Sequence, residues 1–179
     1  MLKILLPETE FFNENTSTFI KVPYKELHLS HSLYTISKWE AKTKKPFLQG
    51  DKTESEIYLY IKCMCEEPIT DLDINRMSRK DIEAINSYIG DPMTATTIQR
   101  PKTTGTDRSV ITSEILYYNM IALNIPFECQ YWHLNRLLTL INVCDIKSNP
   151  NKSKKSTRET LQDYKALNQA RKKALHTTG

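Results

Sequence analysis

The stretch from residue 112 to residue 144 constrains the fold of this chain more than any other. It reads TSEILYYNMIALNIPFECQYWHLNRLLTLINVC, and between Ile115 and Ile125 only Asn119 and Asn124 are polar, apart from two tyrosine hydroxyls. A helix that is apolar on nearly all sides is buried among other elements or spans a membrane. This run is too short for a bilayer, which needs about 20 residues. We therefore expect a buried central helix, capped by Thr112 and Ser113.

Pro126 separates this helix from a second one. Proline cannot donate the helical hydrogen bond, but it is tolerated as the first residue of a new helix. The spacing that follows predicts one amphipathic helix over residues 127–141. Its core face contains Phe127, Tyr131, Leu134, Leu138 and Ile141, widened by Leu137, Leu140 and Cys144. We expect the two helices to pack together and form the core.

Several residues here could in principle do chemistry. Cys129 and His133 are four residues apart, so on one helix they could touch as a nucleophile pair. No orienting partner or oxyanion hole follows from the sequence, and buried free cysteine is common, which favours core packing. Cys63 and Cys65 are separated by one residue, not by the two typical of zinc and redox motifs. We therefore expect a protein that is not an enzyme, with no catalytic residue, no metal site and no cofactor.

The first half of the chain predicts both strands and helices. Residues 3–6, 18–22 and 25–29 favour strands, with a loop over residues 8–18. Helices are expected after Ser30 or Ser32, after the Thr53–Glu56 capping box, and from Ser78 to a stop at Gly90. We expect Trp39 and Phe47 to pack in the core; the alternative is a platform on which bases stack.

A β-hairpin is predicted next. Residues 94–98 and 110–111 are rich in β-branched side chains, and the polar, basic segment RPKTTGTDR lies between them. The expected fold class is therefore α+β and mostly helical. A small N-terminal β-sheet or set of hairpins would pack on a helical core, and a basic helix would follow at the C-terminus.

Charge is distributed unevenly along the chain. Residues 146–179 hold 9 Lys or Arg against 2 Asp or Glu, a net charge of +7, whereas the preceding residues hold 16 against 19. The sequence thus predicts one α+β domain over residues 1–145, and a basic linker and helix over residues 146–179. The apolar run before Pro7 is too short for a signal peptide, and no segment is expected to enter a membrane. Cytoplasmic location with reduced thiols is the expectation.

The basic segment is the predicted partner-binding site. The linker KSNPNKSKKS is polar and broken by proline, and Ser156 with Glu159 forms a capping box for a helix with a narrow apolar stripe. A narrow stripe gains little by docking on its own body. The candidate contact residues are Lys154, Lys155, Arg158, Tyr164, Leu167, Arg171, Lys172 and Lys173.

Four segments together resemble a known group of proteins. They are LSHSLYTISKWEAKTKKPFL, MTATTI, the 112–144 stretch and the terminal LNQARKKAL, so the likeness runs from about residue 29 to residue 175. This set is similar to the tail assembly chaperones of long-tailed, siphovirus-type bacteriophages. The basic C-terminal end departs from the pattern of that group.

The resemblance implies a non-enzymatic function in tail morphogenesis. Such chaperones coat the long helical tape-measure protein, keep it soluble and recruit tail-tube subunits, so tape-measure and tail-tube proteins are the expected partners. Such chaperones often exist in two forms, the longer one made by programmed frameshifting, and this chain would be the shorter form. It would act in the host cytoplasm and could form a homo-oligomer. Two alternatives stay open: a structural virion component, such as a head–tail connector or tail completion protein, and a nucleic-acid-binding regulator that uses the basic helix.

Overall fold

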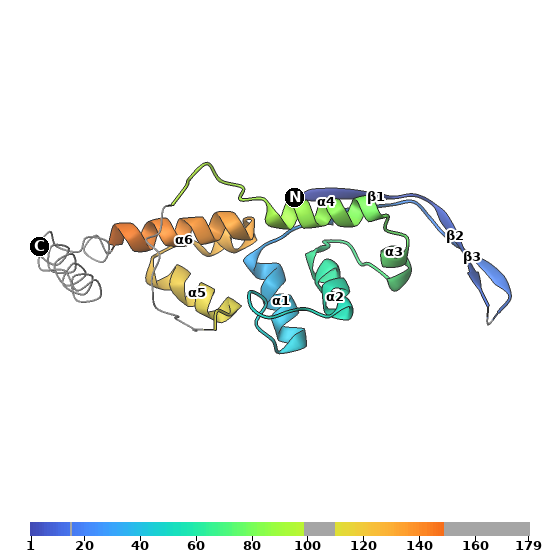
Figure 1. The fold of residues 1–179 in the computed structure, drawn as a ribbon, viewed down its shortest axis with the longest axis horizontal. Helices are drawn as coiled ribbons and strands as arrows, with labels where there is room; N and C mark the ends of the chain where they lie inside the picture. Colours follow the sequence, from blue (N-terminus) through green and yellow to red (C-terminus); the bar gives the residue numbers. More distant parts are fainter. Residues whose placement is uncertain (15, 99–109, 149–179) are drawn as a thin grey trace, which may run out of the picture. The chain divides into compact units, whose positions relative to one another are not determined.

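The computed structural model describes residues 1–14, 16–98 and 110–148 (Figure 1). The chain divides into one unit of residues 1–141 and a second of residues 142–179. Within the second unit, only the end of helix α6 is described. The predicted division into residues 1–145 and residues 146–179 stays a prediction, and the predicted C-terminal helix lies outside the described residues.

These residues form a mostly helical α+β structure, which confirms the predicted fold class for the described part of the chain. The strands are β1 (Leu2–Leu6), β2 (Thr9–Asn13), β3 (Thr18–Val22) and β4 (Lys25–Leu29). The helices are α1 (Leu33–Thr43), α2 (Glu54–Met64), α3 (Asp71–Asn75), α4 (Arg79–Gly90), α5 (Ser113–Ala122), the 3-10 helix η1 (Phe127–Tyr131) and α6 (Leu134–Ser148).

The four strands form a long antiparallel ribbon with a break in its middle. β1 pairs with β4, and β2 pairs with β3. Pro7 follows β1 and Pro23 follows β3, and proline has no N–H to donate to a ladder. The three predicted strands are confirmed, but the loop predicted over residues 8–18 is wrong. Residues 9–13 include the polar Thr9, Glu10 and Asn13 beside two phenylalanines, yet they pair along their whole length with β3.

Capping boxes start the first four helices. Ser32, Thr53, Thr70 and Ser78 each accept a hydrogen bond from the backbone three residues on, and the side chain at that position returns one to the cap backbone. Each box satisfies donors that the first helical turn leaves free. The predicted helices after Ser32, Thr53 and Ser78 are confirmed. Helix α3 was not expected, because its five residues are too few to show a period.

The core lies where β1 and β4 meet helices α1, α2 and α4. Helix α4 runs alongside β1 (Figure 1), and α2 is tied to β4 by hydrogen bonds from Ser30 N to Met64 O and from Glu66 N to His28 O. Trp39 is buried, and its indole N–H donates to the Glu56 carbonyl at 2.9 Å. The packing interpretation of Trp39 is thus confirmed. The other fully buried side chains here include Leu6, Leu27, Leu29, Leu33, Ile36, Met64 and Ile85.

The single helix predicted over residues 127–141 is wrong. Residues 127–131 form η1, Trp132 is extended, and α6 begins only at Leu134. The break arises because this segment pairs with the start of α1: Ser32 and His133 form an antiparallel bridge, and Leu134 N donates to the His31 carbonyl at 2.9 Å. The buried side of the helix changes with it. Leu134, Leu137 and Ile141 are buried, whereas Leu138 is only partly buried and Phe127 and Tyr131 are exposed.

The predicted hairpin of residues 94–98 and 110–111 is also wrong, since the described residues 91–98 and 110–112 form no strand. The basic loop RPKTTGTDR lies outside the described residues. β-branched side chains favour a pleated surface only when a neighbouring strand and a core face are available. The described residues on either side of this loop are mostly exposed, and they have neither a neighbouring strand nor a core face.

Candidate protein-binding surface

Helix α5 is positioned by a carboxylate from another helix. Thr112 occupies the cap position but makes no side-chain capping bond. Instead, the buried Glu40 of α1 accepts the Ser113 N–H at 2.7 Å through Oε2 and the Phe47 N–H at 2.7 Å through Oε1. A carboxylate at a helix N-terminus satisfies a free donor and complements the helix dipole. The predicted Thr112 cap is therefore replaced by Glu40, which lies 73 residues before Ser113 in the sequence.

One side of α5 packs on the body and the other faces solvent. Ser113, Leu116 and Met120 are buried, and they lie on one helical face. Ile115, Tyr118 and Ile121 lie on the opposite face and are exposed, Tyr118 to 67% and Ile121 to 59%. The expectation of a helix buried on all sides is therefore wrong for the described residues. The apolar character that predicted full burial remains, but half of it is presented to solvent.

Exposed aromatic rings also occur on η1 and α1, and Tyr117 of α5 contacts one of them. The ring of Tyr117 stacks on Phe127 with centroids 6.2 Å apart, and its hydroxyl donates to Gln130 at 2.8 Å. Tyr131 of η1 in turn contacts Tyr34 of α1, with centroids 5.3 Å apart. We call the exposed apolar and tyrosine side chains of these three elements, taken together, the α5–η1 surface. It consists of Tyr34, Ile115, Tyr118, Ile121, Phe127 and Tyr131, all of which are exposed.

A patch of this kind is unusual on a protein that works alone. Scattered exposed apolar residues are ordinary, but contiguous apolar patches rimmed by polar groups mark binding sites. The exposed carboxylates Glu114 and Glu128 lie on the same two elements, α5 and η1. Tyrosine is enriched at protein interfaces because its ring buries area while its hydroxyl can stay wet. The arrangement suits contact with another protein.

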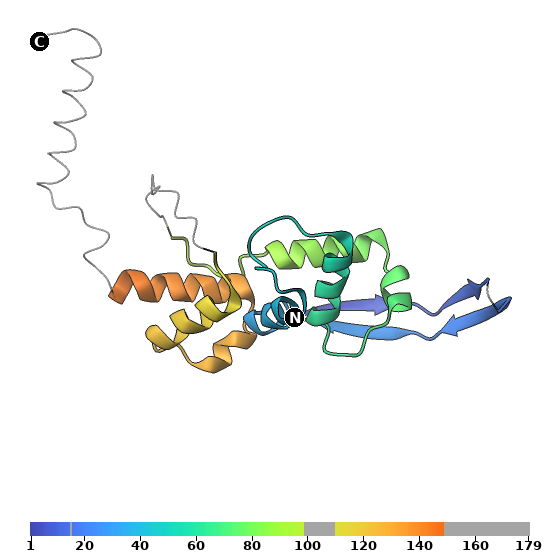
Figure 2. The ribbon, with the colours of Figure 1, turned by 90° about the horizontal axis from the view of Figure 1, so that it is seen from below.

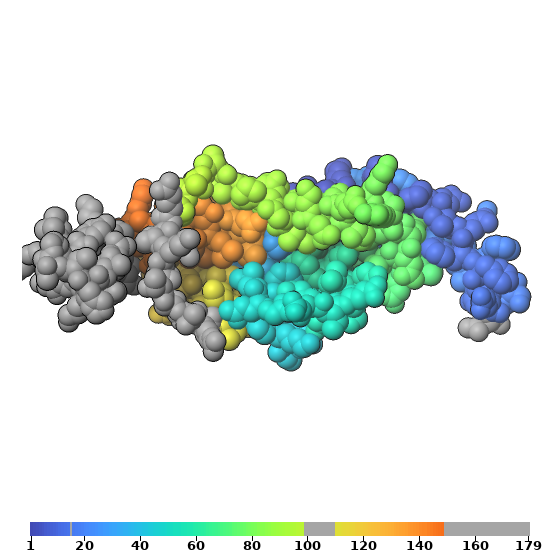
Figure 3. All heavy atoms as spheres, viewed as in Figure 1, coloured from blue at the N-terminus to red at the C-terminus, as the bar shows by residue number. Residues whose placement is uncertain are grey.

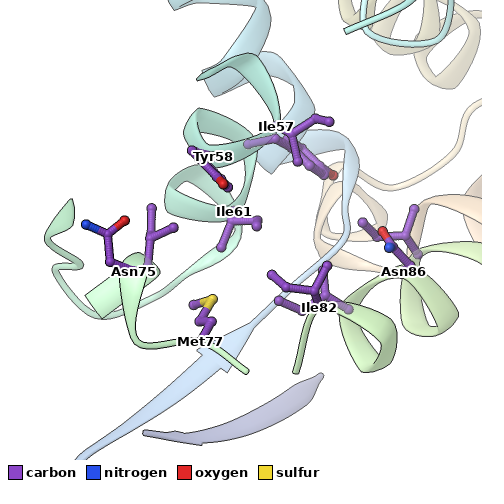
Figure 4. A pocket seen from close by; sticks show the side chains of 11 residues that line it. Ile57, Tyr58, Ile61, Asn75, Met77, Ile82 and Asn86 are labelled. Atoms are coloured by element: carbon purple, nitrogen blue, oxygen red, sulfur yellow. The ribbon is translucent and has the colours of Figure 1, made fainter. Parts of the chain in front are cut away.

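Apart from this surface, a hollow lies between α2, α3 and α4. It encloses about 390 Å³, and Figure 4 shows Ile61, Met77 and Ile82 directed toward it, with Asn75 and Asn86 at its margins. Its lining is dominated by isoleucines, which also include Ile57, Ile74, Ile85 and Ile89. Ligand sites usually combine an apolar wall with a few convergent polar groups. The lining here is apolar enough to hold a side chain of a partner.

The residues considered for chemistry are buried or hydrogen-bonded to other groups. Cys129 is buried in η1, and burial raises the pKa of its thiol, which disfavours the reactive thiolate. His133 directs Nε2 to the Tyr88 carbonyl at 2.9 Å instead. Burial also raises the pKa of the Cys63 and Cys65 thiols. Among the described residues, no group of three His, Cys, Asp or Glu side chains is placed to hold a metal ion.

Acidification tests the environment of the buried His31. Its Nδ1 lies within hydrogen-bonding distance of the Tyr60 hydroxyl, and its ring centroid is 5.0 Å from that of His133. Burial, and then the proximity of His133, lowers the pKa of His31 from 6.5 to about 4. The folded protein keeps this imidazole neutral, while the unfolded chain binds a proton below about pH 6.5.

We therefore expect the free energy of unfolding to fall between about pH 6.5 and pH 4, by up to about 3 kcal/mol from His31. The contribution of His31 is complete above that range. Urea denaturation at pH 7 and pH 5 measures the change, and His31→Asn should make the fall between these two pH values smaller. An equal fall in the variant and the parent would contradict the prediction.

The candidate contact residues predicted from the sequence are Lys154, Lys155, Arg158, Tyr164, Leu167, Arg171, Lys172 and Lys173, and all of them lie outside the described residues. The α5–η1 surface was not predicted. The sequence did contain an indication of it. The predicted helix is apolar on nearly every side, and such a helix needs apolar neighbours on every side. The unit of residues 1–141 supplies them on one side only.

Comparison of the chain with protein-family models, with curated proteins and with solved structures found no match. Among the described residues, no helix is both long enough and apolar enough to cross a bilayer.

Proposed function

We propose that this chain is a non-enzymatic assembly protein, a bacteriophage tail assembly chaperone that binds the tape-measure protein and recruits tail-tube protein in the host cytoplasm. The choice of partner rests on the family resemblance of the sequence. The observation that supports a binding function is the α5–η1 surface. Its exposed apolar and tyrosine side chains fit a protein partner better than a small polar substrate.

The surface is suited to a helical partner. Helix α5 offers Ile115, Tyr118 and Ile121 three residues apart, which forms a ridge that can pack into the groove of another helix. A long helical tape-measure protein with apolar stripes would expose such grooves until it is enclosed in the tail tube. Covering those stripes would keep it soluble, because exposed apolar patches drive aggregation.

The test is co-expression of this chain with a tape-measure protein from the same phage. The double variant Tyr118→Ser and Ile121→Ser should leave most of the tape-measure protein insoluble and weaken binding at least about tenfold, since central aromatic contacts carry most interface energy. Leu5→Ser is a matched control, because Leu5 is 56% exposed but lies on β1. Circular dichroism should show unchanged melting for both variants.

Two results would argue against this use of the surface. Unimpaired tape-measure binding by the double variant would place the contact elsewhere. A clearly lowered melting temperature would mean that the rest of the chain itself covers this face of α5.

The basic segment needs a separate truncation. Helix α6 continues to Ser148, so the chain should be cut after Ser148, which leaves this helix intact. We expect the truncated protein to melt as the full chain does and to bind the tape-measure protein more weakly. Unfolding would place the segment in the core. Loss of only a salt-dependent DNA affinity would favour the nucleic-acid alternative, and detection of the chain in purified virions by mass spectrometry would favour a structural component.

A further inference from the structure

The β2–β3 part of the ribbon, which we call the arm, is exposed to an unusual degree. Phe12 and Phe19 face each other across the two strands with centroids 5.2 Å apart, yet they are 53% and 69% exposed. Every residue of β3 except Val22 is exposed. The arm extends beyond the helices of its unit (Figures 1 and 2), and in Figure 3 its atoms stand clear of them.

An isolated two-stranded ribbon is at best marginally stable in water. The arm is nevertheless held firmly at its base. The Arg76 guanidinium donates to the carbonyls of Pro7 at 2.9 Å and Pro23 at 2.7 Å, which are the two breaks between the ladders. The chain thus directs two strands with exposed phenylalanine rings into solvent, and the outer edges of both strands have no neighbouring strand within the described residues. Unpaired edges of this kind are templates for pairing with another strand.

The two edges differ in how well they match a second copy of themselves. Antiparallel self-pairing of β2 about Phe11 would set Glu8 opposite Glu14 of the second copy, and Glu14 opposite its Glu8. Like charges directly opposite destabilise a strand pair. Self-pairing of β3 about Ile20 brings no like charges together. It sets Thr18 opposite Val22 and Phe19 opposite Lys21, which permits a cation–π contact on each side of the axis.

We propose that the arm is a self-association site, in which β3 pairs antiparallel with β3 of a second copy about a twofold axis at Ile20. The two arms then form one four-stranded sheet in the order β2, β3, β3, β2. This adds cross-strand neighbours for Phe19 and Ile20 and pairs the backbone groups of both β3 edges. Because each copy contributes one five-residue strand, the interface is small and the association is weak and concentration-dependent.

Sedimentation velocity of the full chain tests the proposal. Concentrations from about 10 μM to about 1 mM are needed because a small interface associates weakly. The parent protein should shift from monomer to dimer. Phe19→Lys places an ammonium group opposite Lys21 of the second copy and should weaken association at least about tenfold, because like charges then face each other twice. The exchange Phe19→Lys with Lys21→Phe restores complementary pairs and should restore the dimer.

Phe12→Lys is the matched control for edge pairing. It also adds a charge and also removes the Phe12–Phe19 contact, but it lies on β2, away from the β3 edge. It should leave association within about twofold of the parent. An equal loss with both variants would show that the arms meet face to face and would overturn the edge pairing. A parent protein that stays monomeric at every concentration, with its native melting curve, would overturn the proposal altogether.

The register has its own readout in a Cys144→Ser background, since Cys144 is the partly exposed thiol while Cys63, Cys65 and Cys129 are buried. Ile20→Cys should form a disulfide-linked dimer under mild oxidation, because two copies of that position meet at the axis. Thr18→Cys should not, because its two copies would lie about 13 Å apart along the strands. Equal cross-linking at both positions would contradict the proposed register.

Discussion

Replacing Arg76 by methionine is expected to lower the free energy of unfolding by about 3–5 kcal/mol, as for other buried ion pairs that lose one partner. Both side chains of the pair are almost fully buried, and Arg76 Nη2 lies 2.7 Å from Asp73 Oδ1. Nη1 donates to the Pro7 and Pro23 carbonyls. Methionine fills much of the same volume, so the loss measures the hydrogen bonds and the charge rather than a cavity.

The partners left behind explain the size of this effect. Burial alone would raise the pKa of the Asp73 carboxyl, but hydrogen bonds from Thr70, Lys25 and Arg76 hold its pKa well below the ordinary value. Without Arg76, Asp73 keeps its contacts to Lys25 and Thr70 but loses a buried donor. The carbonyls of Pro7 and Pro23 also lose their guanidinium donor, but both prolines are exposed, so the main cost falls on the buried Asp73 carboxylate.

Urea denaturation monitored by tryptophan fluorescence measures the change. Arg79→Met is the control, because Arg79 also pairs with a carboxylate, Glu83 at 2.8 Å, but its side chain is 93% exposed. Exposed pairs contribute little to stability, so this variant should unfold like the parent. Similar midpoints for the Arg76 and Arg79 variants would mean that the buried network contributes no more than a surface pair.

Leu137→Ala is the second change with a large expected effect, a loss of about 2–5 kcal/mol in the free energy of unfolding. Leu137 is fully buried on the inner side of α6, together with Leu134 and Ile141. Truncating it removes apolar contacts and leaves a cavity that the surrounding helices fill only in part. Thermal melting and urea denaturation would both report the loss.

The neighbouring Leu138 provides a control of identical chemistry. It has the same side chain on the same helix but is only partly buried, so Leu138→Ala should be clearly less destabilising than Leu137→Ala. The comparison discriminates between two registers of this segment. A continuous helix from residue 127 would place Leu138 on the core face with Phe127 and Tyr131, whereas the break before Leu134 places Leu137 there.

The effects at Arg76 and Leu137 also bear on the two proposed interfaces. Arg76 holds the base of the arm, and Leu137 is fully buried on α6. Variants at the two interfaces themselves, such as Phe19→Lys and Tyr118→Ser, change exposed residues. They should therefore alter association without the loss of stability expected for the two core variants.

The sequence by itself determined most of the elements in the first half of the chain. Capping boxes at Thr53 and Ser78 and the serine before α1 marked three helix starts correctly, because a cap involves residues only three positions apart. Strands over residues 18–22 and 25–29 were recognisable from β-branched and apolar side chains beside Pro23. Local chemistry is sufficient wherever the interactions that define an element are local.

Only the tertiary structure decided how the 112–144 stretch is used. The periodicity after Pro126 predicted one helix, but pairing of His133 and Leu134 with residues 31 and 32 breaks it. The cap of α5 comes from Glu40 rather than from Thr112. A sequence pattern reports that side chains are apolar, but which of them become buried depends on contacts between residues about 70 to 100 positions apart. For α5 those contacts cover one face, and the other face remains available to a partner.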